Sequence, residues 1–349
     1  MIYIRTDANQ EVASGHVMRC LTIANKLLAN GENVCFVTSD HESDVLLDTF
    51  VGKHIVLNKD YKNLEDEISL YDSVLSFENR KDIILVDSYF ATAYYLRKLK
   101  EKFIVAYFDD EHKDIYDVDI LINYNLYYTL YDYEKEYPFN CKLLLGGNYV
   151  PLRDQFKGID RPSILKKRPD VLIIVGGADK FHIIKYILEN RNKYLTNDYQ
   201  YHFIVGKYNT DKNDIYKLSK NIKNIYIYDY VKEIADLMSR CDIAISAAST
   251  FLYEACACSL PTVYFSIADN QSNDCYGFEN AKVHLYSGDI RDNLFLTIDN
   301  SFMMMDKLLN NQDEYCKMRE RLKSVVDGIG AERIARVLMD KKKNSCFAS

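Results

Sequence analysis

The stretch "IYIRTDANQEVASGHVMRCLTIANKLLANG", residues 2–31, decides the fold of this chain. A short β-type run at 2–5 leads through a loop into an amphipathic helix predicted at 17–30. Gly31 is the predicted end of this helix, because glycine readily adopts the left-handed conformation that follows a helix. A strand that leads directly into a helix is typical of the first unit of a parallel α/β sheet.

The same alternation continues along the chain. Nearly continuous apolar runs, of the kind buried on both faces of a parallel sheet, predict strands at 33–38, 82–88, 103–110 and 119–125 in the first half. After an interruption the pattern restarts, with strands predicted at 171–175, 201–206, 224–230, 242–247 and 261–267 and late helices at 302–310 and 312–340. We interpret both halves as doubly wound α/β domains.

The interruption covers residues 136–170 and holds four of the five prolines of the chain. We interpret it as the domain connection. The predicted division is a Rossmann-like domain at 1–148, a linker at 149–169, a second Rossmann-like domain at 170–330 and a closing helix and tail at 331–349. Ligands of open parallel sheets bind outside the carboxyl ends of the strands, so we expect the two sheets to face a central cleft.

Composition excludes several classes of function. A net charge of −7 without a Lys/Arg-dense stripe argues against nucleic acid as a partner. No apolar run reaches the roughly 18 residues of a membrane helix, and the first residues do not resemble a signal peptide. The nine cysteines contain no CxxC pair, which favours free thiols and a cytoplasmic location.

His16 lies at the joint between the first strand and its helix, next to Gly15. Gly15 lets a ligand approach the backbone, and the helix start suits an anion. The positive end of the helix disfavours imidazolium, so a neutral His16 could take a proton from water or a hydroxyl. The alternative from the residues alone is a loop histidine without a function.

Acidic and hydroxyl groups follow two neighbouring strands of the first half. Asp87, Ser88 and Tyr89 come at the carboxyl end of one strand, where catalytic groups belong in this architecture. The alternative for Asp87 is a cap of the next helix. The run "FDDE" at 108–111 follows the next strand, and we interpret it as solvated carboxylates in preference to a metal site.

The second half offers groups suited to a nucleotide. Gly176 and Gly177 follow a strand and allow close approach of a phosphate or ribose. The hydroxyls and N–H groups at Ser249 and Thr250 open a helix and would suit a diphosphate. Glu254, one turn further on, could accept the hydroxyls of a ribose. Candidates for reading sugar hydroxyls follow the next strand: Asp269, Asn270 and Gln271.

Nine motifs in order resemble one family. They are "IRTDANQEVASGHVMRCLTIA", "LVDSYF", "FDDE", "DILINYN", "LLLGGNYVPLRDQF", "VGGAD", "YDYVKEIADLM", "ISAASTFLYEA" and "IADNQ". Together they resemble the UDP-2,4-diacetamido-2,4,6-trideoxy-β-L-altropyranose hydrolases of pseudaminic acid biosynthesis. The resemblance covers the chain from Met1 to about residue 290. It implies a GT-B fold and hydrolysis of a UDP-linked deoxy amino sugar to free sugar and UDP, with no metal and no cofactor.

The resemblance also implies roles for individual residues. His16 matches the residue thought to activate water, with Asp87 and Tyr89 as further catalytic candidates and Tyr89 near the sugar. Gly15 and Arg19 match the neighbours of this histidine, Ser249 and Thr250 the diphosphate loop, Glu254 a ribose contact, and Tyr230 and Val231 the segment that lines uracil. Apart from the resemblance, further candidates for binding substrate are Arg5, Asp7, Gly176, Gly177, Asn270 and Gln271. The segment "VDGIGAERIARVL" resembles a closing helix that crosses back to the first domain.

One departure from the family is evident. The family usually has Asp-His-Tyr where this chain has Asp87-Ser88-Tyr89. The missing histidine leaves open another sugar, a weaker hydrolase or an acceptor other than water. A glycosyltransferase on the same scaffold and a non-catalytic nucleotide-sugar-binding subunit are the alternatives, because one fold serves several functions. Other enzymes of the sugar pathway are the expected protein partners.

Overall fold

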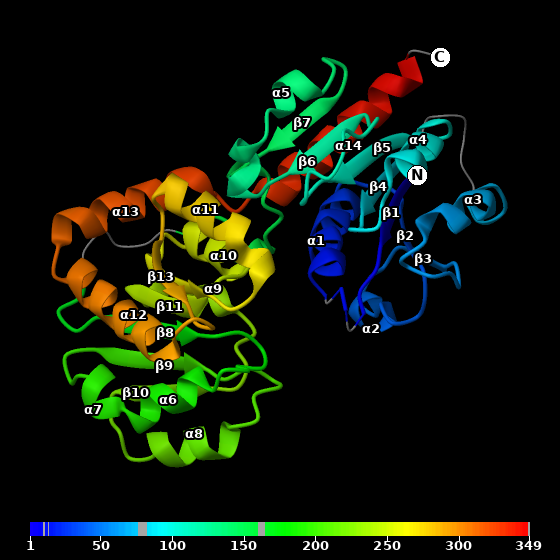
Figure 1. Ribbon diagram of the computed structural model, residues 1–349. Helices are drawn as coiled ribbons and strands as arrows, with labels where there is room; N and C mark the ends of the chain where they lie inside the picture. Colours follow the sequence, from blue (N-terminus) through cyan, green and yellow to red (C-terminus); the bar gives the residue numbers. More distant parts are fainter. Residues whose placement is uncertain (10, 13, 76–81, 160–164, 348–349) are drawn as a thin grey trace. The chain divides into compact units, whose positions relative to one another are not determined.

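The computed structural model describes residues 1–349 except Gln10, Ala13, 76–81, 160–164 and 348–349 (Figure 1). The chain forms two compact units. Unit 1 is Met1–Arg153 together with Ile329–Ser349, and unit 2 is Asp154–Gly328. Each unit contains one sheet in which the described strand pairs are parallel, so the predicted α/β class with two Rossmann-like domains is confirmed.

Unit 1 has a seven-stranded sheet in the order β3-β2-β1-β4-β5-β6-β7. Its strands are β1 (Ile2–Thr6), β2 (Val34–Thr38), β3 (Lys53–Val56), β4 (Ile83–Asp87), β5 (Ile104–Phe108), β6 (Ile120–Asn123) and β7 (Lys142–Leu145). The strand order reverses between β1 and β4, which makes their carboxyl ends the topological switch point of this sheet. Four strands that are neighbours in the sheet, β2, β1, β4 and β5, are buried along their whole length, as the sequence pattern predicts.

The helices of unit 1 are α1 (Gly15–Ala29), α2 (Asp44–Leu47), α3 (Ile68–Val74), α4 (Ala93–Lys100), α5 (Tyr133–Glu136) and α14 (Gly330–Phe347). Its 3₁₀ turns are η1 (Leu64–Glu67), η2 (Leu126–Leu130) and η3 (Gly147–Tyr149). The buried face of α1 consists of Val17, Cys20, Ile23, Ala24 and Leu27, whereas Leu21 and Leu28 are half-buried. Gly31 ends α1 in the left-handed region with φ +82°, as predicted.

Unit 2 has a six-stranded sheet in the order β10-β9-β8-β11-β12-β13. Its strands are β8 (Asp170–Ile174), β9 (Gln200–Ile204), β10 (Ile225–Tyr228), β11 (Ile243–Ala247), β12 (Thr262–Ser266) and β13 (Leu285–Asp289). Its helices are α6 (Ile183–Glu189), α7 (Arg191–Tyr194), α8 (Lys212–Ser219), α9 (Ile234–Arg240), α10 (Phe251–Ala257), α11 (Ser272–Ala281), α12 (Leu294–Leu309) and α13 (Gln312–Val325), with 3₁₀ turns η4 (Asp154–Phe156) and η5 (Asp269–Gln271).

The last helix, α14, lies in unit 1 although it follows unit 2 in the sequence. It packs on α1, and Ile334, Ala335 and Leu338 are buried. Two ion pairs add to this packing, Lys26 with Glu332 at 3.0 Å and Lys342 with Glu32 at 2.5 Å. The position of α14 agrees with the crossing-back expected of a closing helix.

Two predicted elements need correction. The helix predicted at 312–340 is two helices, because the chain turns at Gly328, where φ is +78° and a Cβ atom would lie 2.3 Å from the Phe156 carbonyl oxygen. The segment interpreted as connection contains β7, which extends the first sheet, and the units divide after Arg153. The predicted linker at 149–169 lies partly outside the described residues, at 160–164. Strands β7 and β13 and helices α5, α8 and α11 were not predicted.

No helix among the described residues is both long and apolar enough to cross a membrane.

Candidate active site

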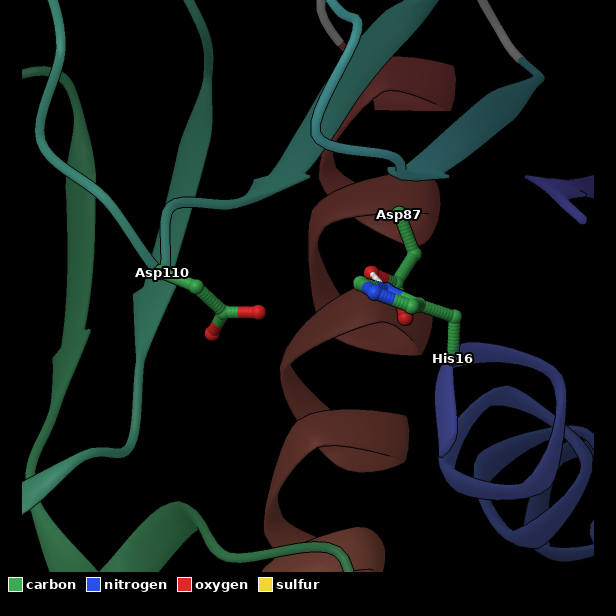
Figure 2. Close-up of side chains that lie close together, drawn as sticks. All are labelled: His16, Asp87 and Asp110. Atoms are coloured by element: carbon green, nitrogen blue, oxygen red, sulfur yellow. Dashed lines mark hydrogen bonds and ion pairs between the residues drawn. The ribbon is translucent and has the colours of Figure 1, made fainter. Parts of the chain in front are cut away.

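His16 lies in the first turn of α1, directly after the loop that leaves β1. Asp87 is the last residue of β4, the strand next to β1 in the sheet. The parallel pairing therefore brings two residues 71 positions apart into contact, with His16 Nδ1 at 2.5 Å from Asp87 Oδ1 (Figure 2). An ionised carboxylate can only accept hydrogen bonds, so Nδ1 donates its hydrogen to Asp87, and in the neutral imidazole the lone pair is then on Nε2.

Arg19 keeps Asp87 ionised. It follows His16 by one helical turn and donates from Nε to Asp87 Oδ2 at 2.6 Å and from Nη2 to Asp87 Oδ1 at 2.5 Å. Burial by itself raises the pKa of Asp87, but the charge of Arg19 and the hydrogen bonds of Arg19 and His16 hold this pKa well below its usual range. Asp87 is therefore a carboxylate at any working pH.

Asp110 completes the cluster from the loop after β5. Arg19 donates from Nη2 to Asp110 Oδ2 at 2.6 Å and from Nη1 to Asp110 Oδ1 at 3.2 Å. Tyr124 accepts a further hydrogen bond from Arg19 Nη1 at 2.8 Å, and the guanidinium carbon lies 4.3 Å from the centre of the Phe108 ring. Sequence reasoning took Asp110 for a solvated acid; its position after a strand that neighbours β4 was the available signal.

A metal ion is a chemical alternative for this cluster. One ligand atom each of His16, Asp87 and Asp110 lie within 4.8 Å of one another, the only such group in the described part of the chain. Figure 2 shows Asp110 pointing toward the His16–Asp87 pair. However, the guanidinium of Arg19 donates to both oxygens of each carboxylate. A metal would have to displace this buried cation, so Arg19 is the better fit as the counter-charge.

Tyr89 packs against the imidazole of His16. Its ring meets the His16 ring edge to face, with centroids 4.4 Å apart, and 44% of the residue is exposed. Burial of the remainder raises the pKa of its hydroxyl above the usual range, so the hydroxyl stays protonated at neutral pH. Ser88, in the position where the related family has histidine, is buried and accepts a hydrogen bond from the Phe90 amide at 3.2 Å.

Arg5 and Asp7 do not fit their predicted contact with substrate. Arg5 is fully buried and binds Glu67 through Nε at 2.8 Å and Asp7 through Nη1 at 2.5 Å. The Asp7 carboxylate also accepts from the Ser39 amide at 2.7 Å. These side chains fasten the ends of β1 and β2 to η1, and a buried charge is stable only when it is paired in this way.

Gly15 and its surroundings remain open. A Cβ atom added at Gly15 would meet nothing within 4 Å, so the loop next to His16 has room for a ligand. At the start of α1, Ser14 makes no side-chain cap bond, whereas Asn9 Oδ1 in the preceding loop accepts from the amides of Glu11 and Val12, both at 2.9 Å.

In unit 2, the candidate nucleotide residues follow the strands as predicted. Gly176, with φ +88°, and Gly177 follow β8 and are exposed. Ser249 and Thr250 are exposed between β11 and α10, and Glu254 is half-buried on α10. Strands β8 and β11 are neighbours, so these loops emerge next to each other at one edge of the sheet.

Gln271 has a different role from the predicted one. Its Oε1 accepts from the amides of Ile267 at 2.7 Å and Ala268 at 3.2 Å, and its Nε2 donates to the Ala248 carbonyl at 2.6 Å. The amide therefore joins the loop after β12 to the loop that carries Ser249, and it supports that loop instead of reading a sugar. Asn270 next to it is exposed.

Tyr230 and Val231 follow β10, at the edge of the sheet of unit 2. Tyr230 is 80% exposed and Val231 is half-buried. One supporting glycine was missed by sequence reasoning: a Cβ atom at Gly206 would lie 2.2 Å from the Gly177 carbonyl oxygen. Glycine at that position lets the loop after β9 lie against the loop after β8.

Known proteins share this architecture. Residues 171–325 match the family model described as "Glycosyltransferase family 28 C-terminal domain". A UDP-2,4-diacetamido-2,4,6-trideoxy-β-L-altropyranose hydrolase of Campylobacter jejuni is 26% identical over 259 residues, which are 73% of this chain and 87% of that protein.

A Helicobacter pylori protein named "Pseudaminic acid cytidylyltransferase and UDP-2,4-diacetamido-2,4,6-trideoxy-beta-L-altropyranose hydrolase" is 30% identical over 70% of this chain, which spans 46% of its length. The crystal structure of Acinetobacter baumannii MurG superposes with a TM-score of 0.70 at 11% identity, covering 97% of this chain and 99% of that chain. These comparisons confirm the GT-B fold and the resemblance to the altropyranose hydrolases.

Proposed function

We propose that this protein hydrolyses a UDP-linked deoxy amino sugar, UDP-2,4-diacetamido-2,4,6-trideoxy-β-L-altropyranose or a close analogue, to free sugar and UDP in pseudaminic-type acid biosynthesis. The observation that carries the proposal is the His16–Asp87 pair at the switch point of the first sheet. It supplies a base for water in a chain whose relatives bear the name of this hydrolase.

The reaction follows from the tautomer of His16. Nε2 takes a proton from a water molecule while the water oxygen bonds to the anomeric carbon of the sugar. The bond from that carbon to the diphosphate oxygen breaks, and its electron pair leaves with UDP. Asp87 stabilises the imidazolium that forms, and general-base help of this kind contributes roughly 10²–10⁴-fold. Attack opposite the leaving group inverts the anomeric centre.

Unit 2 holds the nucleotide in this proposal. The backbone at Gly176 and Gly177 and the hydroxyls of Ser249 and Thr250 take the diphosphate, and charge on the departing UDP is stabilised there. Glu254 accepts the ribose hydroxyls, and Tyr230 and Val231 line uracil. Asn270 and Tyr89 contact the sugar. Arg19 acts on Asp87 and not on substrate, because its guanidinium is engaged by two carboxylates.

A glycosyltransferase with a sugar or lipid-linked acceptor is the second candidate. The family 28 domain favours it, since that family is named for transfer. In this case the hydroxyl of an acceptor replaces the water at His16 Nε2, and UDP forms only when the acceptor is present. A nucleotide-sugar-binding subunit would bind the same donor and release no UDP under either condition.

The experiment is to incubate the purified protein with a panel of UDP-sugars and to identify the products by NMR and mass spectrometry. We expect free sugar and UDP without any added acceptor. His16→Ala should abolish this release, and His41→Ala is the matched control because His41 lies on the surface of the same unit, outside the cluster. Equal release by wild type and His16→Ala would refute the assignment of the base.

Cytoplasmic location is part of the proposal. The eight cysteines whose side chains the structure describes are all reduced, and seven of them are buried. Free thiols in this number suit a reducing compartment. Enzymes that make the UDP-sugar and consume the free sugar would then share the same compartment.

A further inference from the structure

We infer that Asp110 is a positioning residue, which acts through Arg19 to hold the His16–Asp87 pair in its working arrangement. The geometric part of this inference stands on the described contacts alone. Its kinetic test rests on the proposed hydrolysis, so the experiment below also includes a readout that needs no turnover.

Arg19 connects Asp110 to Asp87. Arg19 Nη2 is shared by the two carboxylates, at 2.5 Å from Asp87 Oδ1 and 2.6 Å from Asp110 Oδ2. The same nitrogen lies 3.2 Å from His16 Nδ1. Because Nη2 and Asp87 Oδ1 both lie next to the Nδ1 side of the imidazole, a shift of Arg19 would disturb the bond that fixes the tautomer.

Asp110 itself is held in place by hydrogen bonds from two further residues. Its Oδ1 accepts from Asn125 Nδ2 at 3.0 Å, and its backbone carbonyl accepts from the Tyr127 hydroxyl at 2.6 Å. The Asp110 side chain is 11% exposed, and that of Arg19 is 10% exposed. The long Arg19 side chain loses rotational freedom about several bonds when it is fixed in one conformation. The second carboxylate, which has its own partners, offsets that entropic cost.

Asp110 also sets the net charge of the groups around His16. The groups that face His16 are Asp87 at the end of β4, Arg19 on α1 and Tyr89 after β4, with Asp110 and Tyr124 in contact through Arg19. Two carboxylates and one guanidinium leave one negative charge while His16 is neutral. The cluster becomes neutral when His16 takes a proton from water. Asp110 therefore supplies the charge that balances the imidazolium of the reaction.

The test compares Asp110→Asn with Asp109→Asn. Asp109 is the preceding residue, is buried, and accepts a hydrogen bond from the Tyr133 hydroxyl at 2.9 Å, away from the cluster. We expect Asp110→Asn to lower kcat about 10-fold to 100-fold, a part of the ~10²–10⁴-fold that a general base contributes, with KM changed less than about two-fold. Asp109→Asn should leave kcat unchanged. Asp110→Glu, which restores the charge, should recover part of the loss.

The independent readout is the tautomer of His16, measured by ¹⁵N NMR of histidine-labelled protein and assigned by its loss in His16→Ala. Wild type should show Nδ1–H and unprotonated Nε2, and Asp110→Asn should show a mixture. An unchanged tautomer with unchanged kcat would overturn the inference, and so would a loss that lies in KM alone, because that would place Asp110 on substrate. If wild type turns over no UDP-sugar, the proposed function fails and the tautomer still decides this inference.

Discussion

His16 lies where two electrostatic influences oppose each other. The first turn of a helix carries a partial positive charge, which disfavours imidazolium. Asp87 at 2.5 Å and the excess negative charge of the cluster favour it. A base must be neutral before the reaction and must tolerate a proton during it, so a site that balances these influences suits general-base catalysis.

At this residue scale, we expect hydrolysis to be independent of divalent metal. Treatment with EDTA followed by gel filtration should leave the initial rate of UDP release unchanged, and added Mg²⁺ or Mn²⁺ should not raise it. The physical reason is that Arg19 already donates to both oxygens of Asp87 and of Asp110. A rate that collapses on chelation and returns with one metal would show that the ion displaces Arg19.

His284 gives a second prediction, on stability. It is buried, its Nε2 lies 3.0 Å from the Leu252 carbonyl, and burial lowers its pKa to about 4. The unfolded chain, with a histidine pKa of about 6.5, binds more protons than the folded chain between these values. Stability from this group is therefore complete above about pH 6.5 and is lost as the pH falls toward 4.

The measurement is urea unfolding of wild type and His284→Gln at pH 7 and pH 5. Glutamine stays neutral and can donate to the Leu252 carbonyl in place of the imidazole. Wild type should lose about 2 kcal/mol more than the variant between the two pH values. Equal losses of unfolding free energy in both proteins would mean that His284 takes up no additional proton when the chain unfolds.

At the scale of elements, the loops of unit 2 are held by short contacts between neighbouring strand ends. Gln271 joins the loop after β12 to the loop after β11, and Tyr208 N donates to the Gly177 carbonyl at 3.0 Å. Unit 1 uses the same principle, with Arg5 and Glu67 fastening β1 to η1. Loops that carry a ligand site are positioned by rigid strands and supporting bonds of this kind.

Gly206→Ala tests this support. A Cβ atom at residue 206 would lie 2.2 Å from the Gly177 carbonyl oxygen, so the loop of Gly176 and Gly177 must move. We expect UDP affinity, measured by calorimetry, to fall about ten-fold, the equivalent of ~1.4 kcal/mol. Gly177→Ala is a useful comparison for stability, because its Cβ would meet only Tyr208, at 3.9 Å. Unchanged affinity in Gly206→Ala would separate this loop from nucleotide binding.

At the scale of the whole molecule, the order of the sequence and the division into units differ. Helix α14 completes unit 1 after the chain has passed through unit 2. The chain therefore crosses twice between the units, after Arg153 and after Gly328. The stability of unit 1 should depend on residues that lie more than 170 positions beyond its first segment.

Leu338→Ala tests this dependence. Leu338 is fully buried on α14, and truncation of a buried leucine costs about 2–5 kcal/mol. Hydrogen exchange, read by mass spectrometry, should accelerate in residues 1–153 and not in 154–328. Leu322→Ala, on α13 of unit 2 and equally buried, should give the reverse pattern. Acceleration of both units in both variants would show that they unfold as one cooperative body.

The sequence by itself determined the alternation of strands and helices, because burial on both faces leaves a continuous apolar run and an amphipathic helix repeats every three to four residues. It also placed His16, Asp87 and the acids at 108–111 at strand ends, where parallel sheets carry their sites. Local patterns missed β13 and α11. They also joined α13 to α14, because the turn at Gly328 depends on its close contact with Phe156, which is distant in the sequence.

Only the tertiary structure decided which of these residues meet. The order β1-β4-β5 brings His16, Asp87 and Asp110 to one switch point, and strand order depends on contacts between distant segments. Burial is also a property of the assembled unit, so the sequence could not show that Arg5 is enclosed or that the Gln271 amide is occupied by backbone. Local chemistry chose the candidate residues, and long-range packing decided which of them lie together and which are enclosed by other parts of the unit.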